Sequence, residues 1–116
     1  MDVASTALIS KALDGLYERY LFTAQNIANA NSPDYRPVTV SFEDSLRAAA
    51  GQGLAALQRE TPSVHVAPPS SDGASGVRLD LELASASQTS MRYQALVDIL
   101  GQELAVERAA LTEGGR

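Results

Sequence analysis

The stretch from Ala24 to Arg36 reads AQNIANANSPDYR, and it decides where the first long helix of the chain ends. Asn29 and Asn31 stand just before Ser32 and Pro33. Asparagine tolerates the left-handed conformation in which helices often end, and Pro33 disfavours a helical conformation at Ser32. We therefore expect a helix over residues 3–31, followed at once by a turn.

Upstream of this turn the apolar residues follow a helical period. They recur at alternating spacings of four and three residues, which is the pattern of a coiled-coil stripe. Gly15 weakens the predicted helix only modestly. The stripe consists of Ile9, Leu13, Leu16, Tyr20, Thr23, Ile27 and Ala30, with Thr23 as its polar interruption.

A second stripe with the same spacing lies near the C-terminus and predicts a helix over residues 84–112. It consists of Tyr93, Val97, Leu100, Leu104, Glu107 and Leu111, with Glu107 as its charged interruption. We predict a mainly all-α fold in which the two terminal amphipathic helices pack as a coiled-coil-like hairpin. The residues predicted to carry this packing are Ile9, Leu13, Leu16, Tyr20, Ile27, Tyr93, Val97, Leu100 and Leu104.

The segment after the turn is expected to be extended and then helical. Residues 36–40 contain Pro37 and two valines, which favours extended backbone. Ser41 and Asp44 have the spacing of a helix capping box, with Asp in place of the stricter Glu. A short helix over residues 41–50 follows from this, and residues 54–57 could add a further turn.

The middle of the chain is the least regular part by composition. Residues 59–76 are rich in Pro, Ser and Gly, so we predict a flexible, partly β segment in which residues 64–66 could form a short strand. Residues 77–83 alternate apolar and charged side chains, which fits either a strand or the entrance to the next helix.

Length and composition suggest one domain, residues 1–116, with a thin core. Hydrophobic residues make up 45% of the chain, but it has only two Phe, four Tyr and no Trp. Alanine supplies much of the rest and buries little area, so assembly with other copies is a plausible source of stability. The alternative is a small soluble helical hairpin with a flexible insert and no role in assembly.

Several classes of function are disfavoured by the residues present. The net charge of −5 argues against nucleic-acid binding. There is no cysteine, and His65 is the only histidine, so we expect no metal. No base accompanies a nucleophile and no phosphate loop occurs. We therefore expect no enzyme activity, no cofactor and no small-molecule substrate. A cleaved signal sequence and a membrane span are also not indicated.

The opening stretch resembles the N-terminal signature of the bacterial flagellar axial proteins, whose usual form is close to NIANAxTPGY. The chain departs from that form at Asp34, where family members usually have glycine. Aspartate is acceptable in a turn and tolerates left-handed dihedral angles better than most residues. The residues that match the signature are Asn26, Ile27, Ala28, Asn29, Ala30, Pro33 and Tyr35.

A second block near the C-terminus narrows the resemblance. Residues 91–96 read MRYQAL and resemble the LRYQA segment of the family's C-terminal helix. Residues 79–83 partly fit the acidic start of that helix, whereas Thr89 stands where an asparagine is usual. Chain length and the RYQAL form are more similar to the flagellar basal-body rod protein B family than to its sibling, rod protein C.

The resemblance implies a structural protein of the proximal rod that is exported to the flagellar basal body without a cleaved signal peptide. It implies self-association in a helical array, and partners among the other rod proteins, the rod–ring adaptor and the export gate. Phe42 and Leu46 match a pattern that docks on the gate in early export substrates. Because they are four residues apart, they share one helix face. They could equally be packing residues. The rival class is a small helical adaptor or export-chaperone-like binding module.

Overall fold

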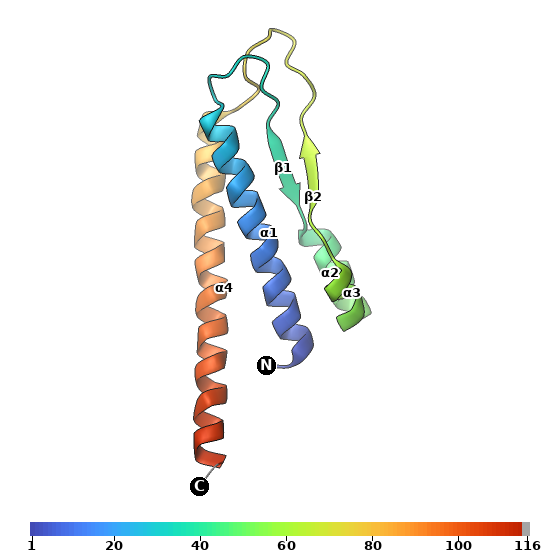
Figure 1. Ribbon diagram of the computed structural model, residues 1–116, viewed down its shortest axis with the longest axis vertical. Coiled ribbons are helices and arrows are strands. Elements are labelled where there is room, and N and C mark those ends of the chain that lie inside the picture. The colour runs from blue at the N-terminus through green and yellow to red at the C-terminus, as the bar shows by residue number, and fades with distance from the viewer. Residues whose placement is uncertain (115–116) are drawn as a thin grey trace.

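The computed structural model describes residues 1–114 and has a mainly all-α fold, as the sequence predicts (Figure 1). Two long helices, α1 and α4, lie side by side, and a small sheet and two short helices cover the other side of α1. The elements are α1 (Val3–Ala28), β1 (Val38–Ser41), α2 (Glu43–Gln52), α3 (Leu54–Arg59), β2 (Ser63–Val66) and α4 (Leu79–Gly114).

The molecule is a narrow rod with extents of 70 × 27 × 13 Å. At a rise of about 1.5 Å per residue, α4 is about 54 Å long and α1 about 39 Å. The C-terminal part of α4 therefore runs past the N-terminal end of α1 (Figure 1). This overhang leaves a section of α4 without any neighbour in the chain.

Helix α1 ends earlier than predicted. Asp2 caps its first turn, where the carboxylate accepts the backbone N–H of Ser5 at 2.7 Å. At the other end, the side-chain amide of Asn29 donates to the carbonyl of Gln25 at 2.8 Å. This side-chain bond satisfies a carbonyl of the last turn, so the helix closes at Ala28 and the boundary at residue 31 is wrong.

The capping box predicted at Ser41 is wrong. Ser41 is the last residue of β1, and its hydroxyl lies 3.3 Å from Nε2 of His65 on β2. Helix α2 begins at Glu43 without a side-chain cap and ends at Gln52, two residues later at each end than predicted. Gly53, with φ of 106°, separates α2 from α3, so the predicted extra turn is confirmed.

The middle segment contains regular structure. β1 and β2 pair antiparallel with Val38 opposite Val66, which confirms the short strand predicted over residues 64–66. Backbone bonds from Asp34 N–H to the Gly73 carbonyl, and from Gly76 N–H to the Tyr35 carbonyl, tie residues 73–76 to the turn after α1. Helix α4 begins at Leu79 and ends at Gly114, so the strand alternative for residues 77–83 and the helix bounds predicted at residues 84 and 112 are wrong.

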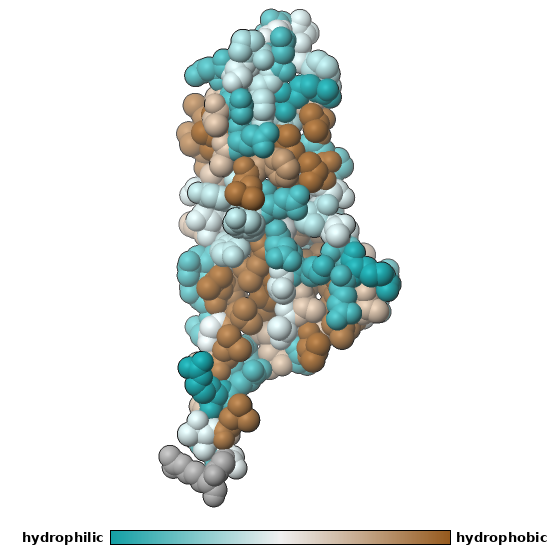
Figure 2. Space-filling model, in the orientation of Figure 1, coloured by the Kyte–Doolittle hydropathy of each residue, from teal (hydrophilic) through white to brown (hydrophobic). Residues whose placement is uncertain are grey.

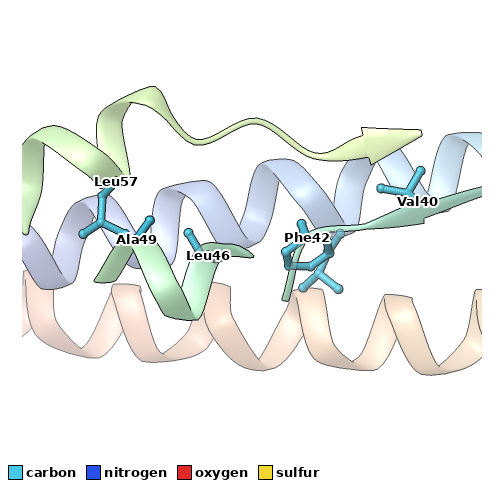
Figure 3. Packing of buried hydrophobic residues seen from close by; sticks show 6 residues of the cluster. Val40, Phe42, Leu46, Ala49 and Leu57 are labelled. Carbon is cyan, nitrogen blue, oxygen red and sulfur yellow. The ribbon is translucent and has the colours of Figure 1, made fainter. Parts of the chain in front are cut away.

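The hydrophobic core does not lie between the two long helices. It lies between α1, β1, α2 and α3, and Leu96 of α4 packs against its margin (Figure 3). Within residues 1–114, the only fully buried residue of α4 is Thr89. The buried apolar residues are Leu16, Val40, Phe42, Leu46, Ala49 and Leu57.

Candidate assembly surfaces

Asn26 is the centre of the turn that follows α1. Its side chain is 1% exposed, and its amide donates to the Val38 carbonyl at 2.8 Å and accepts the Val38 N–H at 3.0 Å. The same amide oxygen accepts the Tyr35 hydroxyl at 2.8 Å. Asn26 therefore bonds both the N–H and the C=O of Val38 on the edge of β1 that faces away from β2, as a neighbouring strand would. Two residues of the predicted signature thus fix the chain reversal together.

Asp34 occupies a position that favours glycine. Its φ is 60°, and among residues 1–114 no other non-glycine residue has a positive φ. The turn thus demands a left-handed residue where the axial proteins usually have glycine, and aspartate meets the demand at modest cost. Its backbone N–H donates to the Gly73 carbonyl at 2.9 Å, which holds the turn against the middle segment.

The other signature residues divide into two groups. Asn29 belongs to the turn, because its side-chain oxygen accepts the Ser32 hydroxyl and its carbonyl accepts the Ser75 hydroxyl, each at 2.9 Å. Ile27 and Ala30 are half-buried, whereas Ala28 and Pro33 are exposed. The signature therefore combines residues that hold the turn with residues that face solvent.

The predicted packing residues are brought together only in part. Leu16 is buried, and Ile9, Leu13, Ile27 and Leu100 are half-buried. Tyr20, Tyr93, Val97 and Leu104 are exposed by 45%, 37%, 38% and 52%. The seam between α1 and α4 instead buries Thr23 and Thr89. The long helices are thus neighbours, but their apolar stripes are not fully buried against each other.

A groove lies between α1 and α4 beside this seam. It has a volume of about 260 Å³ and is lined by Leu16, Tyr17, Tyr20, Thr89, Ser90 and Tyr93. Tyr20 and Tyr93, which stand on the two predicted stripes, thus border one concavity. The three tyrosines are each partly exposed, and tyrosine combines an apolar ring with a polar hydroxyl.

An exposed apolar surface follows α4. Tyr93, Val97, Leu104 and Leu111, called here the α4 stripe, repeat along one helix face, and exposure rises to 78% at Leu111. Apolar residues along the lower half of the molecule are visible in Figure 2. A solvated apolar stripe of this kind on a small domain marks an interaction surface.

Phe42 and Leu46 are core residues in this conformation. They are 6% and 5% exposed and pack in the cluster under α1 (Figure 3). Phe42 is the residue just before α2 and Leu46 lies in its first turn, and both side chains belong to the core. The folded chain therefore does not present these two side chains as a docking patch, and a role at the export gate requires α2 to leave the core.

Two residues that the sequence reasoning passed over control this packing. A Cβ on Gly15 would lie 2.6 Å from the Phe42 ring, so only glycine lets the ring lie against α1. Arg19 covers the same ring, with its guanidinium 4.8 Å from the ring centroid. The sequence pattern indicates only that Gly15 weakens the helix modestly, and Arg19 is not part of the apolar stripe. Only the position of Phe42, 27 residues after Gly15, gives them their role.

Arg19 also forms the strongest ion pair of the fold, with Glu43. The guanidinium donates from Nη1 and Nη2 to both carboxylate oxygens at 2.6 Å, and Nη2 donates to the Val40 carbonyl at 2.7 Å. Arg92 on α4 lies 3.7 Å from the same carboxylate. The hydrogen bonds from Arg19 lower the pKa of Glu43 to about 2. Glu43 therefore links α1, α2 and α4.

Within the part of the chain that the structure describes, His, Asp and Glu do not gather in a group able to hold a metal ion. Among the same residues, no helix combines the length and the apolar content that crossing a membrane requires. No protein-family model matches the chain, and no curated protein matches it at a significant level. The resemblance to the axial proteins therefore depends on the two blocks of sequence described above.

Proposed function

We propose that the chain is a structural subunit of the bacterial flagellar rod, of the kind found in the rod protein B family of the proximal rod. The observation that carries the proposal is the α4 stripe, which lies exposed on a narrow subunit whose own core is small. Covering such a stripe removes apolar surface from water and is therefore favourable. An axial assembly supplies those neighbours along the whole length of α4.

Assembly in this account is head-to-tail. Copies that repeat the same contact between two different surfaces form an open helical array rather than a closed ring or dimer. The α4 stripe would supply one surface and the outer face of α1, with Tyr17 and Leu21 exposed by 56% and 50%, the other. Other rod proteins and the rod–ring adaptor would contact the same two surfaces at the ends of the array that copies of this chain form.

The turn after α1 suits a shaft that transmits torque. The side-chain amide of Asn26 and the backbone N–H of Asp34 hold the chain reversal, so the end of α1 is tied to the sheet and to the middle segment. Export fits the burial of Phe42 and Leu46, because a chain that passes a narrow channel is unfolded there and both side chains are then free. Gate docking in this account is a property of the unfolded chain.

A second candidate is a small helical adaptor. The groove lined by Tyr17, Tyr20 and Tyr93 favours it, because a concave apolar site of about 260 Å³ can receive one or two side chains of a partner helix. An adaptor of this kind would form a discrete complex in solution, whereas a rod subunit would polymerise or stay in the basal body.

The two candidates are separated by a charge placed on the α4 stripe. Leu104→Asp puts a carboxylate on the stripe at a side chain that is 52% exposed, so the subunit itself should still fold. Ala105→Asp adds the same charge one residue further along, off the stripe. We expect Leu104→Asp to abolish motility and incorporation into basal bodies, and Ala105→Asp to leave both unchanged. Normal motility with Leu104→Asp would remove the stripe from the assembly.

A further inference from the structure

The two-stranded sheet has one open edge, which belongs to β2. All four residues of β2 are exposed, and the strand stands at the outer side of the sheet (Figure 1). Both peptide groups of Val38 bind Asn26, so they point away from β2. In an antiparallel ladder, when the N–H and C=O of one residue point away from the partner strand, those of the residue opposite it also point away. The peptide groups of Val66, and by alternation those of Val64, therefore face outward at the open edge.

The sequence of this edge is nearly the same in both directions, and only Ser63 and Ala67 break the symmetry. From Pro62 to Pro68 it runs PSVHVAP, with proline, a small residue and valine on each side of His65. A strand of this kind is complementary to an antiparallel copy of itself. In the register centred on His65, Val64 of one copy lies opposite Val66 of the other, and every outward N–H and C=O of the two valines finds a partner.

The prolines set the limits of this pairing. Pro62 and Pro68 stand at the next outward-facing positions and lie opposite each other in the centred register. Neither has an N–H to donate, so no donor is left unpaired at either end. If one strand shifted by two residues, a valine N–H or carbonyl would lie opposite a proline, and hydrogen bonds between the two strands would be lost. The palindrome therefore selects one register, with the valines as cross-strand apolar pairs.

We propose that β2 pairs with β2 of a second copy of this chain, antiparallel and about a two-fold axis at His65. This contact uses one surface on both copies, so it closes on itself and cannot extend a polar array. The paired area is far below the roughly 1,200 Å² of stable complexes, so the dimer is transient. The inference does not depend on the rod proposal.

Disulfide trapping tests the register directly, because the chain has no cysteine of its own. His65→Cys places the thiols of two copies opposite each other at about 4.5 Å between Cα atoms, within reach of a disulfide. In the same register the two cysteines of Ser63→Cys are about 13 Å apart, so this variant is the matched control. Under mild oxidation we expect about tenfold more covalent dimer from His65→Cys than from Ser63→Cys.

A second variant separates strand pairing from chance collision. Val64→Pro removes an outward N–H while leaving the bonds of β2 to β1 in place. In the His65→Cys background it should reduce covalent dimer to the level of the control, with the helical circular dichroism unchanged. The proposal is overturned if His65→Cys cross-links no faster than Ser63→Cys, or if Val64→Pro leaves the cross-linking as it was. Normal motility of any of these variants has no bearing on the result.

Discussion

At the scale of single residues, individual side chains of α1 decide how closely the rest of the chain packs on this helix. Asn26 replaces a strand at the edge of β1, and Gly15 leaves room for the ring of Phe42. Both residues act on partners that are distant in sequence. Their effects on stability can be predicted because the contacts that each would lose or gain are known.

Asn26→Ala should lower the free energy of unfolding by about 2–3 kcal/mol, because it leaves both peptide groups of Val38 and the Tyr35 hydroxyl without their partner. Denaturant unfolding followed by circular dichroism measures the change. Asn31→Ala is the control. Asn31 is exposed and lies two residues after Asn29, the C-cap of α1, so this variant should leave the free energy of unfolding unchanged. Equal stability of the two variants would mean that Asn26 does not hold the turn.

Two glycine-to-alanine substitutions in the long helices should change the free energy of unfolding in opposite directions. Gly101→Ala, where a Cβ meets nothing within 4 Å, should stabilise the chain through helix propensity by about 0.5–1 kcal/mol. Gly15→Ala gains the same propensity but drives a methyl group into the Phe42 ring, so we expect a net loss of about 1–3 kcal/mol. Thermal unfolding of both variants is the measurement. A rise in melting temperature for Gly15→Ala would show that the ring is not held against α1.

At the scale of secondary-structure elements, Glu43 joins three helices through Arg19 and Arg92. The pKa of Glu43 falls from 4.5 to about 2 in the folded chain. A carboxylate with a lowered pKa stabilises the fold fully above its unfolded pKa and loses that contribution as the pH falls. The loss therefore occurs between pH 4.5 and about pH 2.

Glu43→Gln should accordingly flatten the acid limb of the stability curve. The carboxylate is 40% exposed, so solvent screening limits the pair to about 1 kcal/mol. Unfolding free energies at pH 6 and at pH 3 measure the slope, and the variant should lose about 0.5 kcal/mol less than the wild type, because only part of the contribution is lost by pH 3. Asp44→Asn, whose carboxylate is 98% exposed, is the matched control and should keep the wild-type slope. A wild-type slope in Glu43→Gln would contradict the link.

The long elements could be predicted from sequence because their signals are local. The heptad spacing located α1 and α4, and the glycines and Pro33 located breaks, to within a few residues. The position of Asp34 in a left-handed turn was also predictable, since only glycine, asparagine and aspartate suit it well. Local patterns failed at Ser41, where a capping motif was overridden by strand pairing with Ser63.

The core and much of the candidate site could not be predicted in the same way. A heptad stripe indicates an apolar face but not which partner covers it. In this chain α1 buries Gly15 and Leu16 towards α2 and β1, while the α4 stripe stays exposed. The roles of Arg19 and Glu43 depend on side chains meeting across 24 residues, which no spacing rule encodes.

At the scale of the whole molecule, the small core and the exposed α4 stripe have one consequence. Residues 1–114 bury only six apolar side chains, so the subunit has a small margin of stability, and covering the stripe should add stability through assembly. The axial resemblance and the exposed stripe are independent observations that favour the same proposal. The central claim is therefore that this chain is a component of the flagellar rod.

Mass spectrometry of purified hook–basal bodies from the source bacterium tests that claim most directly. The account predicts peptides of this chain in the preparation, at a level comparable with the other rod proteins, and their loss when the Leu104→Asp variant replaces the wild type. If the wild-type chain is absent from the hook–basal bodies and is recovered instead as a soluble cytoplasmic protein, the rod proposal is contradicted.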